Sequence, residues 1–366
     1  DGVLKSIHSG PAALSEQPVE YSQADSLDAE FLMPGLVEAH CHLFLNGDEE
    51  DLQARSDYLK APLEIMLQTA RLNVEACLAS GITLIRDAGD RYGVNHAIRE
   101  ECSAHACGTV IRSPGFALRQ QKKYGAFMAK EVSSPQEIRS AVAETAQRAD
   151  DLKILQTGII DFEAGEVTKP PQFDLDSLKL MVELANEKGL KTFAHCSGLK
   201  GLEVAVEAGV NSIEHGFFMS EAILDKMAEK KIAWVPTFSP VHSQWEHPEV
   251  VGWSKHTVAN LRRILDDHLR HVEMAFHQGV QLVAGSDAGG LGVTHGKALI
   301  DELNFFLEAG LPMQEVLVSA TSRPRQLWNS EPANIIENSS ANFIVLGASP
   351  FDHPEALSDV KMVFSQ

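Results

Sequence analysis

The sequence predicts an α/β fold, namely a (β/α)8 barrel of the TIM type with a small β-sandwich domain formed from both chain ends. Between about residues 35 and 310, short runs rich in β-branched residues alternate with longer amphipathic stretches. This alternation is typical of repeated βα units, which build a parallel sheet. Eight such runs can be counted, and eight parallel strands with helices between them close most naturally into a barrel.

The strand candidates begin with GLVEAHCHL and end with QLVAGSDAG. In chain order they are residues 35–43, 82–89, 109–115, 152–158, 191–198, 212–216, 232–238 and 281–289. Helical spacing between them is seen at Leu63, Leu67, Ala70, Val74 and Leu78, and again at Leu178, Met181, Val182 and Ala185. We expect the barrel to span residues 35–329.

The two chain ends do not follow the βα pattern. Strand-like runs occur in FLMP (31–34), ANFIVLG (341–347) and VKMVF (360–364). Because these runs lie outside the expected barrel, we predict that residues 1–34 and 330–366 pair in the small β-domain.

Length and charge restrict the class of protein and of partner. A chain of 366 residues, 44% of them hydrophobic, fits one barrel-sized domain with appendages better than several small domains. The net charge of −20 disfavours nucleic acids and anionic membranes as binding partners. We therefore expect a small-molecule substrate, and a homo-oligomer is possible. Five cysteines without a CxxC pair, in a chain too long to need disulfides, indicate free thiols in a reducing cytoplasm.

Four of the expected strands end in side chains that can bind a metal. His40 and His42 end the first strand and, being two residues apart, point the same way. His195, His215 and Asp287 each end another strand. Any one of them has an ordinary explanation as a hydrogen-bonded or capping residue. In a parallel barrel, however, all five would meet at one mouth, where imidazole and carboxylate suit Zn, Mn, Fe or Ni.

Lys153, near the start of the fourth strand, is an unexpected residue for a cation site. A charged ammonium there would repel the metals. It is either an ordinary salt-bridged residue, or it has reacted with carbon dioxide to give an anionic carbamate that bridges two ions. The residues alone leave both explanations open.

These motifs together resemble the amidohydrolase superfamily, in particular its prolidase, dipeptidase and imidazolonepropionase-like branch. The resemblance rests on PGLVEAHCH, the lysine of the fourth strand, single histidines ending the fifth and sixth strands, and GSDAGG. It implies that two cations, zinc by expectation, are bound by His40, His42 and Asp287 and by His195 and His215, with carbamylated Lys153 between them. It further implies cleavage of an amide-type C–N bond by a metal-bound hydroxide, with Asp287 as general acid and base.

Three functions remain to be compared. The first is hydrolysis of a dipeptide, an N-acyl amino acid or a cyclic amide. The second is deamination of a heterocyclic amine with one metal, which Lys153 and the lack of an HxxE pair at His195 disfavour. The third is a non-catalytic binding protein, which is disfavoured because all six expected positions are filled. Candidate substrate contacts follow the strands at Arg119, His242 and His295.

Overall fold

A computed structural model describes residues 3–7, 27 and 29–365. Its centre consists of parallel strands in two sheets. The first sheet has the order β2-β3-β4, with β2 Leu36–Cys41, β3 Ile82–Asp87 and β4 Val110–Arg112. The second has the order β10-β9-β8-β7-β5-β6, with β5 Ala117–Gln120, β6 Ala129–Val132, β7 Asp151–Leu155, β8 Lys191–Cys196, β9 Ser212–His215 and β10 Ala233–Val235.

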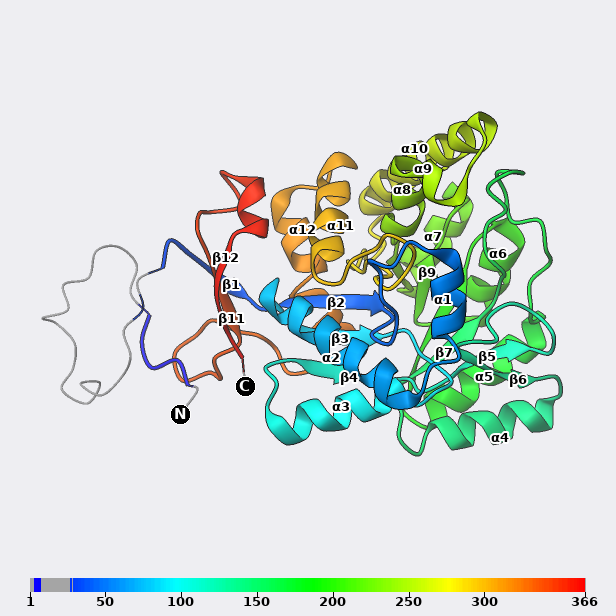
Figure 1. Cartoon of the computed structure of the whole chain (residues 1–366), viewed down its shortest axis with the longest axis horizontal. Coiled ribbons are helices and arrows are strands. Elements are labelled where there is room, and N and C mark those ends of the chain that lie inside the picture. Colours follow the sequence, from blue (N-terminus) through cyan, green and yellow to red (C-terminus); the bar gives the residue numbers. More distant parts are fainter. Residues whose placement is uncertain (1–2, 8–26, 28, 366) are drawn as a thin grey trace, which may run out of the picture.

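Helices lie around these strands (Figure 1). They are α1 Leu52–Tyr58, α2 Leu63–Ala79, α3 Val94–His105, α4 Pro135–Thr145, α5 Leu175–Glu187, α6 Leu199–Ala208, α7 Glu221–Lys230, α8 Ser239–Glu246, α9 Pro248–Val251, α10 Lys255–Gln278, α11 Lys297–Glu308, α12 Met313–Ser319 and α13 Ser322–Leu327. Helix α5 buries all four apolar residues that the spacing marked. Because helices cover their outer face, β2, β3 and β7 are buried along their whole length, as is typical of parallel sheets.

Seven of the eight expected strands are present, and the eighth differs. Residues 281–289 form no regular strand and make only isolated parallel bridges, at Leu282 with Trp234 and at Ala288 with Cys41. The backbone N–H of Val283 donates to Trp234 (2.9 Å), and that of Ala39 donates to Ala284 (3.2 Å). This segment therefore connects β10 to β2 through a few hydrogen bonds, because the chain bends here toward Asp287.

Two strands between β4 and β7 were not expected. β5 pairs in parallel with both β6 and β7, which inserts an extra pair of short strands into the second sheet. Among the described residues no strand ladder joins β4 to β7 or β5, although the N–H of Asp150 donates to the carbonyl of Ser113 (3.0 Å). The fold is thus α/β with parallel sheets, and full closure of the barrel stays a prediction.

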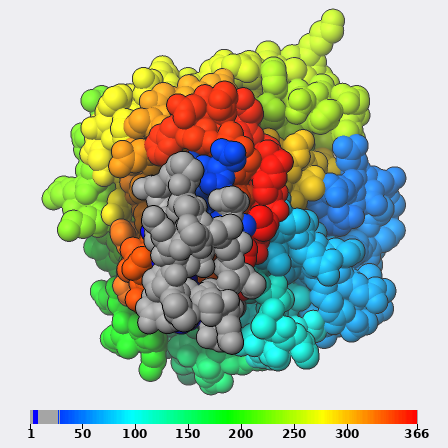
Figure 2. Space-filling model, turned by 90° about the vertical axis from the view of Figure 1, so that its left-hand side faces the viewer, coloured from blue at the N-terminus to red at the C-terminus, as the bar shows by residue number. Residues whose placement is uncertain are grey.

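The chain ends meet in a separate antiparallel sheet. Its order is β1-β11-β12, with β1 Phe31–Pro34, β11 Phe343–Leu346 and β12 Val360–Phe364, and a short 3-10 helix, Pro354–Ser358, precedes β12. Figure 2 shows red C-terminal residues against blue N-terminal ones on this face. The described residues contribute one sheet here, while residues 1–2, 8–26 and 28 lie outside them. The β-sandwich therefore stays a prediction.

The cysteines differ in part from the expectation of free thiols. Cys102 in the last turn of α3 forms a disulfide with Cys107, because a left-handed Ala106 (φ 48°) turns the chain back on itself. Two of the five thiols that the sequence predicted to be free are therefore paired. Cys41, Cys77 and Cys196 are free and buried. In the part of the chain that the structure describes, none of the helices is both long and apolar enough to span a bilayer.

Candidate metal centre

Five of the predicted ligands lie together at the carboxyl ends of the strands. The Nε2 atoms of His40 and His42 are each 3.5 Å from Oδ1 of Asp287, and Nδ1 of His215 is 4.0 Å from Oδ2 of the same carboxylate. The ring of His195 is 4.4 Å from that of His215, centroid to centroid. Ligand atoms of His40, His215 and Asp287 all lie within 4.8 Å of one another. One cation between them could therefore be held by all three.

The backbone is unusual where these strands end. His215, Thr237 and Asp287 have φ angles of 67°, 51° and 56°, in the left-handed region that residues other than glycine rarely adopt. Such conformations cost roughly 1–3 kcal/mol each and persist only where the surroundings hold them. Thr237 is within 2.7 Å of Nδ1 of His215 through its hydroxyl. The strain therefore accompanies residues whose side chains are directed into the centre.

Burial keeps the imidazoles neutral. It lowers the pKa of His42 and of His195 to about 3, with the neighbouring Lys153 as the second cause in both. It also lowers the pKa of His40 and His215 well below the usual value, helped by Lys153 at His40 and by His195 at His215. Neutral imidazole is the form that binds a metal. These side chains are therefore ready to act as ligands at neutral pH.

Lys153 of β7 lies inside this cluster. It is 1% exposed, and its Nζ is 3.3 Å from Nε2 of His40 and 4.6 Å from the ring centroid of Phe193. Burial lowers the pKa of this lysine, while burial raises the pKa of Asp287, which faces it. Both shifts favour the uncharged forms. Lys153 is thus close enough to the ligands to join them if its positive charge is removed.

Glu214, which the sequence analysis missed, positions His40. Its carboxylate is 2.5 Å from Nδ1 of His40 and accepts two hydrogen bonds from Arg86, at 3.0 and 3.1 Å. The hydroxyl of Ser212 also donates to it (2.5 Å). A carboxylate on Nδ1 fixes the tautomer and leaves the Nε2 lone pair for a metal. The signal for it in the sequence was a carboxylate inside the strand candidate SIEH, directly before the expected ligand His215.

A second buried glutamate, Glu38, links the segment that carries His40 to the segment that carries Asp287. It accepts hydrogen bonds from the backbone N–H groups of His40 and Ser286, both 2.9 Å, and from the hydroxyl of Ser286 (2.6 Å). Burial raises the pKa of Glu38 to about 7. Together with the backbone hydrogen bond from the N–H of Asp287 to the carbonyl of His40 (2.6 Å), this side chain holds Asp287 beside His40.

Comparison with known families identifies the family of this chain. A model of the amidohydrolase family matches residues 31–365. The chain belongs to this family.

Named relatives of this amidohydrolase are hydrolases. Ochratoxinase of Aspergillus niger is 28% identical over 91% of this chain and 73% of the relative. Imidazolonepropionase of Rhodococcus jostii is 26% identical over 56% of this chain and 51% of the relative. The solved structure of a Xaa-Pro dipeptidase with bound methionine has a TM-score of 0.76 at 24% identity, covering 91% of this chain and 85% of that one. The likeness to that structure concerns the fold, which is of the TIM-barrel type.

Family membership sets the general chemistry of this amidohydrolase. It is a hydrolase of carbon–nitrogen bonds that acts on small molecules, in a family whose members generally bind divalent metals. The residues fit such a metal, since four neutral imidazoles and one carboxylate converge here and His40 has its carboxylate partner.

The three residues expected to contact the substrate differ in their surroundings. Arg119 lies in β5, is 8% exposed and is paired with Glu131 (2.5 Å), so its guanidinium already has a partner. His295 is 3% exposed, and neither of its ring nitrogens has a hydrogen-bond partner among the described residues. His242 lies in α8, partly exposed, with its ring 4.9 Å from that of Phe305. Of the three, His295 lies near enough to the ligand His42 to help lower the pKa of that ligand, after burial and Lys153.

The role of Glu214 in this amidohydrolase can be tested by Glu214→Gln. We expect the affinity for Zn²⁺ to fall by about 10- to 100-fold, because the amide no longer holds His40 as a carboxylate does. Competition with a chromophoric chelator measures the affinity. Glu302→Gln is the matched control, since Glu302 is equally buried but is bound by Ser239. Equal affinities in wild type and Glu214→Gln would contradict the positioning role.

Proposed function

We propose that this amidohydrolase cleaves the amide-type bond of a dipeptide, an N-acyl amino acid or a cyclic amide. The observation that supports this most is the convergence of four buried, neutral histidines on one carboxylate beside a buried lysine. In the proposed centre, His40, His42 and Asp287 hold one cation and His195 and His215 hold the other. We take zinc as the metal, with Mn, Fe or Ni as alternatives. We also propose that the two parallel sheets belong to one closed barrel, at whose mouth this centre lies.

Lys153 completes the proposed centre as a carbamate. Its Nζ is 3.3 Å from a histidine nitrogen, and its low exposure makes a permanent ammonium beside two dications very unfavourable. The ammonium first loses a proton, and the neutral amine then adds carbon dioxide and releases a second proton, which gives an anionic carbamate with two oxygens. Such a group would suit a position between two metals.

The bound cations would supply Lewis-acid chemistry, since they acidify water and polarise a carbonyl oxygen. Asp287 is the residue that moves protons. One of its oxygens, Oδ1, faces His40 and His42. The other, Oδ2, lies 4.0 Å from Nδ1 of His215 and would take a proton from the attacking water and give it to the leaving nitrogen. Proton transfer of this kind is worth roughly 10²- to 10⁴-fold in rate.

The proposed function is tested by removing and restoring the metal. We expect the purified protein to contain one to two equivalents of a divalent transition metal by elemental analysis. Dipeptides, N-acyl amino acids and cyclic amides would then be screened with metal-loaded protein. Activity should fall about 100-fold or more after chelation and return with Zn or Mn. The midpoint of thermal unfolding should also fall on chelation, because a ligand that binds the folded state stabilises it. Protein free of metal that gains neither activity nor stability with these ions would refute the proposal.

A further inference from the structure

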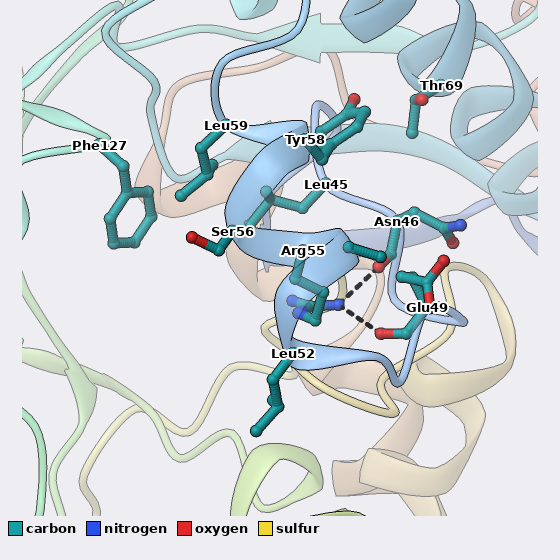
Figure 3. A pocket seen from close by; sticks show the side chains of 11 residues that line it. Leu45, Asn46, Glu49, Leu52, Arg55, Ser56, Tyr58, Leu59, Thr69 and Phe127 are labelled. Carbon is teal, nitrogen blue, oxygen red and sulfur yellow. Dashed lines mark hydrogen bonds between the residues drawn. The ribbon is translucent and has the colours of Figure 1, made fainter.

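A cavity of about 530 Å³ lies against helix α1. Its wall includes Leu45, Leu52, Leu59 and Phe127, together with Arg55 and Tyr58 (Figure 3). In Figure 3, Phe127 projects from a different segment than helix α1, beside whose end Leu59 lies, so the apolar side chains come from two separate segments. A volume of this size lies within the roughly 300–1,000 Å³ of pockets that bind small organic molecules.

Three segments connect this cavity to the metal centre. The backbone N–H of Leu45 donates to the carbonyl of the ligand His42 (3.0 Å). Arg55 donates from Nη2 to the carbonyl of Gly289 (2.7 Å), two residues beyond Asp287. The ring of Phe127, also in the wall, is 6.2 Å from that of Tyr124, which is 5.5 Å from the ring of His195. None of the proposed ligands lines the cavity. Three of its lining residues, Leu45, Arg55 and Phe127, are nevertheless linked to chain segments that carry ligands.

Most polar groups in the wall of the cavity already form hydrogen bonds within the protein. Tyr58 donates its hydroxyl to the carbonyl of Phe44 (2.5 Å), and Thr69 donates to Ile65 (3.3 Å). Arg55 donates from Nη1 to the carbonyls of Asn46 (2.7 Å) and Glu49 (3.0 Å), so it ties the loop after β2 to α1. What the wall offers to a ligand is therefore chiefly leucine and phenylalanine surface, which favours an apolar group.

We propose that this cavity binds a bulky apolar group, of the size of an aromatic ring system, on one side of the scissile amide. The inference rests on the proposed function, since it names the substrate class of the same centre. A methyl group would leave most of the cavity filled with water, whereas a naphthyl group would displace that water from leucine and phenylalanine side chains. Amides that carry such a group should therefore be preferred over their acetyl or alanyl counterparts.

The test uses the metal-loaded enzyme and two graded series of N-acyl amino acids. In one series the acyl group grows from acetyl to benzoyl to naphthoyl, and in the other the amino-acid side chain grows from methyl to benzyl to naphthylmethyl. We expect kcat/KM to rise by roughly 10- to 100-fold along one series, as for hydrophobic pockets in general. Affinity for the same compounds, measured by calorimetry on protein freed of metal, should rise in the same order.

Two variants change the cavity in opposite ways. Phe127→Ala removes part of its wall, and Ser56→Trp fills it from α1, where Ser56 is exposed. Both should reduce the ratio of naphthyl to methyl substrates by about tenfold or more. Phe351→Ala is the matched control, because Phe351 is 55% exposed and packs near Phe31 in the sheet of the chain ends. This control should keep the wild-type ratio.

The outcomes separate the inference from the proposed function. Hydrolysis of methyl and naphthyl compounds at equal kcat/KM would overturn the inference and leave the amide hydrolase standing. Binding that rises with the apolar group and is lost in Ser56→Trp, without hydrolysis of any compound, would support the cavity and overturn the proposed function. Binding and hydrolysis that are both indifferent to the size of the group would overturn the inference whatever the reaction is.

Discussion

Replacing Asp287 with Asn is expected to lower kcat for amide hydrolysis by about 10²- to 10⁴-fold, with a much smaller loss of metal. An asparagine keeps one oxygen that can face His40 and His42, both 3.5 Å from the carboxylate in the wild type. It cannot accept the proton of the attacking water and return it to the leaving nitrogen. Steady-state kinetics together with elemental analysis of the same preparation measures both quantities.

His40→Ala is the informative comparison for this variant. It removes a ligand and leaves Glu214 and Lys153 without their neighbour, so metal content and rate should fall together. The contrast between the two variants separates proton transfer from metal binding. If Asp287→Asn lost its metal as completely as His40→Ala does, Asp287 would be a ligand only, and another group would have to move the proton.

Replacing Lys153 with Ala should leave the enzyme nearly inactive and with less than its full metal content. If a carbamate bridges the ions, short-chain carboxylates such as formate or acetate should restore part of the activity, because their two oxygens can occupy the same position. Carbon-13 NMR of protein supplied with labelled bicarbonate should also give a carbamate signal that is missing from the variant. Lys60→Ala, which alters an exposed lysine paired with Asp57, is the control and should behave as wild type.

A different result would change the description of the centre. Full activity and full metal content in Lys153→Ala would make this lysine a structural residue that packs against Phe193. A centre with one metal, held by His40, His215 and Asp287, would then describe the protein better.

The sequence was a better guide to the ligands of the proposed centre than to Glu214 and Glu38, the buried residues that hold those ligands in place. His40, His42, His195, His215 and Asp287 could be found because each ends a β-branched run, and parallel strands bring such ends to one edge. Glu214 and Glu38 were missed because they lie within strands, where the pattern gives no sign of which side chain they contact. Their partners Arg86 and Ser286 are distant in sequence, so only the tertiary structure reveals the hydrogen bonds.

The strands that were predicted wrongly from the sequence are either short or irregularly paired. β5 and β6 are four residues each and carry Arg119, Lys130 and Glu131, which obscured their strand pattern. Residues 281–289 have an apolar strand-like composition, yet they make only isolated bridges because the backbone turns at the left-handed Asp287. Neither the pairing of a short strand nor a positive φ at a non-glycine residue can be read from local composition.

The contact between Glu38 and Ser286 joins two segments that are synthesised at different times. The two residues are 248 positions apart in the sequence, and their hydrogen bonds bring the segment that carries Asp287 beside His40. A ribosome releases the N-terminal part first, at about 5–20 residues per second, so β2 is made well before its partner. Until Asp287 has been made, the proposed site of His40 and His42 lacks its carboxylate ligand. In the proposed centre, metal binding would therefore be completed late in biosynthesis, and a chain truncated before residue 286 would lack the carboxylate of Asp287.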